Sequence, residues 1–178
     1  GWTDAEVAAW TLRFWAPLMV PGLLQTERYM YEVFRAGGHP HDRATQAVAA
    51  RMARQAILDR DSPPTVVAII DELVLARQIG SPEVMAEQCA RLLAVSEHSS
   101  VIVQVVRGAS AGLGGMLALA EGPRGPVLLS GSLLEDIVTA DVQQVRAAGA
   151  IVDAVRGAAM STSDTRVILG EAHQRWTA

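Results

Sequence analysis

Lysine and asparagine are absent from this 178-residue sequence, so all 15 basic residues are arginine. They stand against 19 acidic residues, which gives a net charge of −4. A negative chain is poorly suited to releasing counterions from phosphates, and no segment shows the clustered basic and amide residues of a recognition helix. We therefore expect no direct binding to nucleic acid. The arginine bias in a composition rich in alanine and glycine indicates codon pressure rather than phosphate recognition.

Cysteine is limited to Cys89, which excludes an internal disulfide and a thiolate metal cluster. Its place in a helical pattern predicts a small buried apolar residue. His39 and His41 lie two apart in a loop with no further ligand nearby, so neither a metal site nor a cofactor is expected. No apolar run approaches the ~20 residues that span a bilayer, and no leader pattern opens the chain. We expect a cytoplasmic protein without membrane contact.

Aromatic residues are scarce at 4%, although hydrophobic residues make up 50% of the chain. The core must therefore be built from alanine, valine, leucine and isoleucine. Neither a repeat nor a low-complexity linker is present, and the length suits one domain over 1–178.

Hydrophobic periodicity and capping residues predict the secondary structure. Helices are expected from Thr3-Asp4 to about residue 16, and over about 23–36, 43–60, 82–97, 141–157 and 161–176. Short apolar or β-branched runs predict strands over 65–70, 100–106, 115–121 and 126–132, with 122–125 as a hairpin turn. The first helix rests on one apolar stripe, formed by Val7, Trp10, Phe14 and Leu18.

This order of elements predicts an α+β domain with a small, mostly antiparallel sheet of about four strands, covered by about six helices. We expect the helices to lie on one side of the sheet. The regular βαβ alternation of a classical doubly wound fold is missing.

Asp71 and Glu72 follow a buried strand, where carboxylates can line a cleft and handle a proton or hold a cation. Adjacent strand residues point to opposite faces, so a second interpretation is that Asp71 caps a short helical turn. A glycine-rich stretch at 112–115 predicts a loop or lid, and no helix follows it as a phosphate cradle would require.

Arg51 and Arg54 lie three apart on the helix predicted over 43–60, and therefore share a face. They can grip a ligand carboxylate, or form an internal salt bridge by pairing with Asp71 and Glu72 across the core. Arg13 is a third candidate of this kind.

Seven residues, Val20 to Thr26 (VPGLLQT) with Tyr29 following, resemble the start of the uncharacterised C-terminal sensor domain of actinobacterial Xre-type helix-turn-helix regulators, the WhiJ-like proteins. The similarity extends over essentially the whole chain. It continues through the R-x-x-R-Q phrase of Arg51 to Gln55, then Ile70 to Leu73, Gly80, Val84, Met85, Gln88, Leu92, Val103 to Val105 and Ser161 to Ser163.

The resemblance implies a domain that senses a small apolar ligand or a small protein partner, in the regulation of development or secondary metabolism. It implies ligand-binding roles for Arg54, Gln55, Asp71, Glu72, Gln104 and Arg107. The helix-turn-helix itself is missing, so the chain is expected to be either part of a longer regulator or a stand-alone domain. The family's polar and aromatic strand residues are replaced by aliphatic ones, which suits an apolar cavity.

Two alternatives remain open. A stand-alone biosynthetic enzyme, a cyclase or isomerase, would need only a shaped apolar cavity and a few polar groups, with Asp71 and Glu72 as catalytic candidates assisted by Arg54 and Gln104. An oligomerisation module, such as a homodimer, would instead use Trp2, Trp10 and Trp15 as interface anchors.

Overall fold

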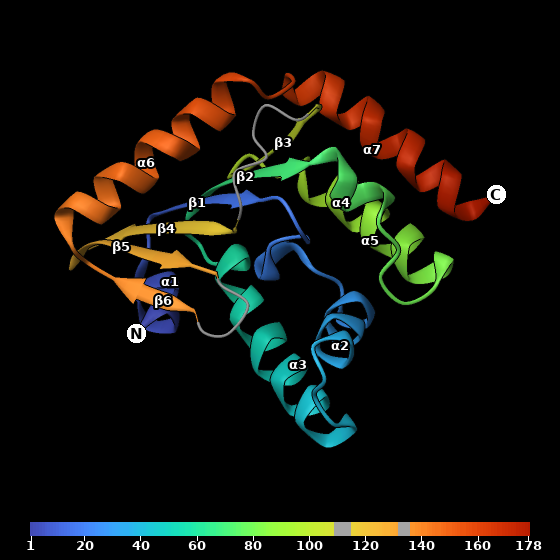
Figure 1. Cartoon of the computed structure of the whole chain (residues 1–178), viewed down its shortest axis with the longest axis horizontal. Helices are drawn as coiled ribbons and strands as arrows, with labels where there is room; N and C mark the ends of the chain where they lie inside the picture. The colour runs from blue at the N-terminus through green and yellow to red at the C-terminus, as the bar shows by residue number, and fades with distance from the viewer. Residues whose placement is uncertain (109–114, 132–135) are drawn as a thin grey trace.

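One mixed β-sheet organises the computed structural model, which describes residues 1–108, 115–131 and 136–178 (Figure 1). The strand order is β3-β2-β1-β4-β5-β6, in which β1, β2 and β3 are parallel and β4, β5 and β6 are added antiparallel. The strands are β1 (Thr11–Ala16), β2 (Thr65–Asp71), β3 (Val101–Val106), β4 (Leu117–Gly122), β5 (Gly125–Ser130) and β6 (Ile137–Thr139). The α+β class is confirmed, but the sheet has six strands rather than about four, and half of it is parallel.

Seven α-helices and two short 3-10 turns complete the described residues. They are α1 (Trp2–Ala8), η1 (Gly22–Leu24), α2 (Glu27–Ala36), α3 (His41–Gln55), η2 (Ala56–Asp59), α4 (Glu72–Ala76), α5 (Pro82–Val95), α6 (Val142–Gly157) and α7 (Thr162–Thr177). The caps predicted at Ser81, Asp141 and Ser161 are confirmed, since each accepts a hydrogen bond from the backbone of the turn that it begins, whereas the cap predicted at Thr3-Asp4 is wrong because α1 already begins at Trp2. Local capping chemistry therefore set these helix starts.

The first predicted helix is wrong beyond residue 8, because residues 11–16 form the central strand β1. Strand β1 hydrogen-bonds to β2 on one side and to β4 on the other. The apolar stripe misled the prediction: Trp10 and Leu18 are 58% and 47% exposed, whereas Leu12 and Trp15 are fully buried. A short segment can fit both a helical and a strand period, and here the pairing with two neighbouring strands decides.

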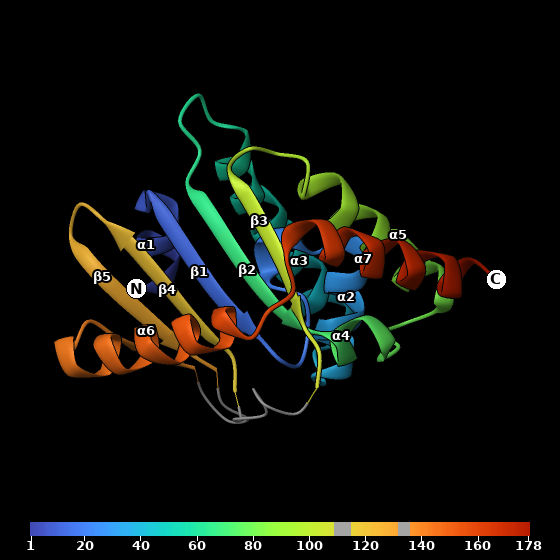
Figure 2. The same cartoon turned by 90° about the horizontal axis from the view of Figure 1, so that it is seen from above.

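Helices cover both faces of the sheet, not one as the sequence predicted. Helix α6 lies across one face, where Ala148 and Val152 pack on Trp15, Ile69 and other strand residues (Figure 2). The opposite face is covered by α1, α5 and α7 and by the chain between β1 and β2, around a larger apolar cluster. Strands buried on both faces explain the continuous apolar runs of β2 and β3.

The predicted hairpin between β4 and β5 is confirmed, with Gly122 paired to Gly125. Gly125 has a φ of +88°, a left-handed conformation that a residue with a side chain rarely adopts. Strand β6, which pairs with β5, escaped prediction because it is only three residues long.

Helices α2 and α3 form an arm that projects from the rest of the molecule (Figure 1). The arm begins where the chain leaves β1, and its two helices pack on each other. The carboxyl ends of β1, β2 and β3 lie together at one end of the sheet, where β4 begins and β5 ends. We call this the carboxyl end of the sheet. Among the described helices, none is long and apolar enough to cross a membrane.

Candidate ligand-binding site

Asp71 and Glu72, the candidates at the carboxyl end of β2, are both engaged by neighbouring groups. The carboxylate of Asp71 accepts a hydrogen bond of 2.8 Å from the backbone N–H of Leu73, which confirms the interpretation of Asp71 as a helix cap. Glu72 accepts hydrogen bonds from Arg107 Nε at 3.0 Å and from the Gly108 N–H at 3.2 Å. The structure thus brings Glu72 and Arg107 together as an ion pair, more than half exposed on the arginine side.

Gln104 lies on the outermost strand, β3, and its side chain bonds to α6 and the segment after it rather than to the other candidates. Its amide nitrogen donates to the Met160 carbonyl at 2.9 Å, and its amide oxygen accepts from Arg156 Nε at 3.1 Å. The Met160 N–H donates to the Val105 carbonyl at 2.9 Å, so the link between α6 and α7 covers the edge of the sheet. Both ends of the Gln104 amide therefore serve this closure.

Gln55 holds the loop that leaves β1 in place. Its buried amide nitrogen donates to the carbonyls of Gly22 and Gln25, at 2.9 and 2.8 Å. Gln25 in turn donates to the Val20 carbonyl at 2.7 Å, and Gln88 of α5 bonds to both Leu24 O and Thr26 N. We call Gln25, Gln55 and Gln88 the glutamine clamp. It links the V-P-G-L-L-Q-T and R-x-x-R-Q phrases, because Gln55 of the second phrase donates to two backbone carbonyls of the first.

Arg54, in the same phrase, forms an internal ion pair with Glu6 of α1. The Arg54 Nε lies 3.2 Å from a Glu6 carboxylate oxygen, and the Glu6 side chain is only 6% exposed. Burial raises the pKa of Glu6 above its ordinary value of 4.5, and the charge of Arg54 opposes that shift. An internal salt bridge is thus formed by Arg54, but its partner is Glu6, and the predicted pairing with Asp71 and Glu72 is wrong because those carboxylates bind Leu73 N–H and Arg107 instead.

Arg51, one helical turn before Arg54, is a half-buried cation. Its guanidinium carbon lies 4.5 Å from the centre of the Phe34 ring, a cation–π arrangement. Burial lowers the pKa of Arg51 below its ordinary value, the charge of Arg54 lowers it further, and Glu6 and Asp136 act in the opposite direction. Among the residues that the structure describes, no carboxylate lies within 4.0 Å of the Arg51 nitrogens.

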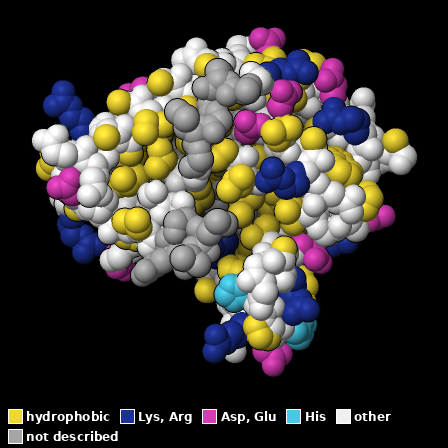
Figure 3. Space-filling model, in the orientation of Figure 1, with side chains coloured by type: hydrophobic (Ala, Val, Ile, Leu, Met, Phe, Trp, Pro, Cys, Tyr) yellow, Lys and Arg dark blue, Asp and Glu magenta, His cyan; other side chains and the backbone are white. Residues whose placement is uncertain are grey.

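Space beside Arg51 is left by Gly22. A Cβ atom built on Gly22 would meet only Arg51 within 4 Å, its Nη1 at 3.9 Å and its Cδ at 4.0 Å. On the sheet side, Gly131 follows β5 with Met116 and Asp136 next to it. Hydrophobic side chains gather at the centre of the face shown in Figure 3, and the surface is hollowed there, where the arm joins the body. We call the space beside Arg51, Phe34 and Gly22 the arm hollow.

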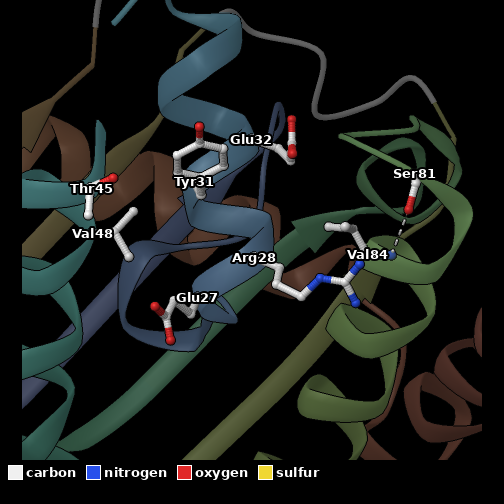
Figure 4. A pocket seen from close by; sticks show the side chains of 8 residues that line it. All are labelled: Glu27, Arg28, Tyr31, Glu32, Thr45, Val48, Ser81 and Val84. Carbon is white, nitrogen blue, oxygen red and sulfur yellow. Dashed lines mark hydrogen bonds between the residues drawn. The ribbon is translucent and has the colours of Figure 1, made fainter. Parts of the chain in front are cut away.

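Two cavities lie beside the arm helices. A cavity of about 350 Å³ lies between α2, α3 and the start of α5, where Glu27, Arg28 and Glu32 present charges of both signs (Figure 4). Arg28 is already paired with Glu87 at 3.2 Å. A recess of about 490 Å³ lies beside the glutamine clamp and is lined by Asp59, Glu87 and Arg91, among others. Neither contains a buried charged group without a partner.

Arg13 and Cys89 both have structural roles. Arg13 bridges the sheet and α6, with Glu121 at 3.0 Å and Asp153 at 3.1 Å. Cys89 is 1% exposed, and burial raises the pKa of its thiol to about 11, as its predicted core role requires. Within 1–108, 115–131 and 136–178 there is no group of three or more metal-ligating side chains. Positions 112–114 of the predicted loop or lid lie outside the described residues.

A protein-family model described as "Domain of unknown function (DUF5753)" matches residues 2–171, nearly the whole chain. No curated protein and no solved structure matches the chain.

Proposed function

Since the chain belongs to the DUF5753 family, whose description assigns no activity, we propose from its geometry that it is a ligand-sensing domain. Its ligand is a small molecule that occupies the arm hollow. The resemblance of VPGLLQT and R-x-x-R-Q to the WhiJ-like regulators supports a sensory role of this kind. In that context the domain would report ligand binding to a DNA-binding partner or domain.

The observation that carries this proposal is the half-buried guanidinium of Arg51, which lies against the Phe34 ring and has no carboxylate within 4.0 Å among the described residues. Removing part of the hydration of a cation costs free energy that is normally recovered from a nearby anion. Ligand pockets combine an apolar lining with a few polar groups of this type. The arm hollow has both features.

The arm also offers a mechanical route from ligand to output. The arm is joined to the body through the glutamine clamp and the Arg54–Glu6 pair. Two residues in these contacts, Arg54 and Gln55, lie within about one helical turn of Arg51 on α3. A ligand held between Arg51 on the arm and the sheet would contact both parts at once. Binding would therefore favour one arm position over others, as population shift by a ligand requires.

The engagement of Asp71 and Glu72 favours sensing over catalysis. One caps a helix and the other is paired with Arg107, so a cyclase or isomerase would have to break these contacts to use either carboxylate on a substrate.

Native mass spectrometry of the chain produced in an actinobacterial host tests the proposal. We expect a mass adduct that is released on denaturation and identified as one small molecule. Gly22→Leu places a side chain against Arg51 and should abolish the adduct, whereas Gly157→Leu, at a glycine with open space around it, should retain it. A clean mass for the unmodified chain, or retention of the adduct in Gly22→Leu, contradicts a ligand in the arm hollow.

A further inference from the structure

The recess beside the glutamine clamp combines features that select one kind of ligand. We propose that it binds a small organic cation of the alkylguanidinium class, with Asp59 as its carboxylate and the amide oxygens of Gln25 and Gln55 as neutral acceptors. This site lies apart from the arm hollow, and its occupant is a second ligand, independent of the one proposed above.

The recess has a volume of about 490 Å³, which is within the range of small-molecule sites. Its walls come from the start of α2, from the end of α3 with the turn η2, and from α5, so it lies where the arm meets the body. The wall residues of α3 and η2 follow the i, i+3, i+4, i+7 spacing of one helix face: Met52, Gln55, Ala56 and Asp59. Arg51, which borders the arm hollow, is not among the residues that line this recess.

Two glutamine side chains in the wall have an amide oxygen without a donor. Gln25 is only 1% exposed; its amide nitrogen donates to the Val20 carbonyl, and its buried amide oxygen accepts nothing from the described residues. Gln55 uses its amide nitrogen on the Gly22 and Gln25 carbonyls, and no described donor bonds to its oxygen. An acceptor withdrawn from water without a donor costs free energy, which a ligand N–H group recovers.

The charges around the recess are mainly negative. Its lining contains the carboxylates Glu27, Asp59 and Glu87 and the cation Arg91. Glu87 is paired with Arg28 at 3.2 Å, whereas Glu27 and Asp59 form no ion pair within the described ranges. These two carboxylates outnumber Arg91 by one, so a monovalent cation balances the charge of the lining. An anion would instead lie among an excess of carboxylates.

A guanidinium group suits these acceptors better than other organic cations. It carries several N–H donors in one plane, so it can donate to a carboxylate and to amide oxygens at once. Asp59 follows Gln55 by one helical turn on the same face, which places an ionic and a neutral acceptor side by side. A quaternary ammonium would supply the charge but would leave the amide oxygens without a donor. Met52 and Ala56 add apolar surface for the alkyl part of the ligand.

Titration of the isotope-labelled chain with n-butylguanidinium, followed by NMR of the side-chain amide groups, tests the proposal. Because the sequence contains no asparagine, every such signal belongs to a glutamine. We expect the signals of Gln25 and Gln55 to shift and that of Gln174, an exposed residue of α7, to stay. N-butylurea has nearly the same shape without the charge, and butyltrimethylammonium has the charge without N–H donors. Each should bind at least about tenfold more weakly.

Variants of the lining locate the site and give the sign of its charge. Asp59→Asn should weaken binding of n-butylguanidinium at least about threefold. Asp61→Asn removes the same charge from an exposed residue that does not line the recess, and should leave binding unchanged. Arg91→Gln removes the one cation of the lining and should strengthen binding. Ala56→Trp should block the recess, whereas Ala49→Trp, at an exposed position of α3, should not.

Circular dichroism melting of each variant shows whether it is folded. If Asp59→Asn does not fold, Arg91→Gln decides, because a gain in affinity cannot result from unfolding.

Absence of n-butylguanidinium binding, or equal binding of N-butylurea, overturns the proposal. An equal loss of affinity in Asp59→Asn and Asp61→Asn also overturns it, because attraction to the overall negative charge then explains the binding. Weaker binding by Arg91→Gln, or shifts confined to other glutamines, contradicts a cation in this recess. If these results fail while native mass spectrometry finds an adduct that Gly22→Leu abolishes, the proposed function stands without the second site.

Discussion

The two faces of the sheet are stabilised in different ways. The face under α6 has a small apolar cluster around Trp15, and two polar side chains of the strands bind the helix: Arg13, with its two carboxylates, and Gln104, which accepts from Arg156. The other face has a larger apolar cluster and buried polar side chains. Those below 10% exposure are Glu6, Gln25, Thr26, Gln55, Gln88 and Thr165, all on the elements that cover this second face or on the loop leading to the arm.

The face under α6 therefore depends mainly on apolar packing, whereas the second face also depends on specific hydrogen bonds. Apolar burial under α6 requires only shape and volume, which many sequences can satisfy. The glutamine clamp requires particular donors opposite particular carbonyls, and an unpaired group there is costly. Arg51 lies one helical turn before Gln55, so its position depends on the directional contacts of the clamp as well as on hydrophobic packing.

The largest effect is expected from Trp15→Ala on the α6 face. Trp15 is fully buried, so its truncation should cost about 3–5 kcal/mol of unfolding free energy, the range for large aromatic residues in cores. Urea unfolding measures this loss. Trp15→Phe serves as control and should cost less than about 1.5 kcal/mol, because it keeps most of the volume and removes an indole N–H without a partner in the described residues. Equal losses would indicate that packing does not dominate this face.

Gln55→Met tests the second face. The change keeps the length of the side chain but leaves the Gly22 and Gln25 carbonyls without their donor, at a cost of about 1–3 kcal/mol. Gln46→Met, at an exposed position of the same helix, should change stability by no more than about 0.5 kcal/mol. If both variants unfold at the same urea concentration as the unmodified chain, the clamp does not stabilise the arm.

Glu6→Gln tests the second face through the pH dependence of the free energy of unfolding. Because burial raises the pKa of Glu6 in the folded protein, the folded state binds more protons than the unfolded state above pH 4.5. The stability contributed by Glu6 therefore falls as pH rises from 4.5 through the folded pKa, and a neutral amide removes this dependence. Unfolding at pH 4 and pH 7 should show the variant improving relative to the unmodified chain at the higher pH. A stability difference that does not change with pH would contradict the raised pKa.

The smallest effect is expected for Arg13→Met, which removes one of the two polar links between the sheet and α6. Both carboxylate partners are more than 40% exposed, so the loss should be about 1 kcal/mol or less and should shrink further with added salt. Thermal melting at low and high salt measures it. A loss as large as that of Gln55→Met would remove the distinction between the two faces.

Much of the fold could be predicted because its signals are local. Ser81, Asp141 and Ser161 begin helices by capping chemistry that involves only the next three or four residues. Strand β2 and the β4–β5 hairpin follow from β-branched runs and turn glycines. Strand β1 was assigned to a helix because its pattern fits both periods, and its β-structure depends on partners that lie about 50 and 100 residues away along the chain.

The candidate site shows the same division. Arg51 and Arg54 were singled out because a helix places residues three apart on one face. Which of them would be paired could not be predicted, because Glu6 and Phe34 come from other elements. Gln104 and Arg107 are close to Asp71 along the parallel strands, yet their side chains serve the sheet edge and Glu72 instead.

The sequence by itself determined the α+β class, the helix starts and a chemistry without lysine, disulfide or thiolate cluster, since these depend on composition and on short-range geometry. Only the tertiary structure decided that β1 is the central strand, that both faces of the sheet are covered, and that Arg54 is neutralised while Arg51 is not. The physical reason is that strand pairing, burial and charge compensation are interactions between residues far apart in the chain, and the free energy of each depends on which partner the fold brings close.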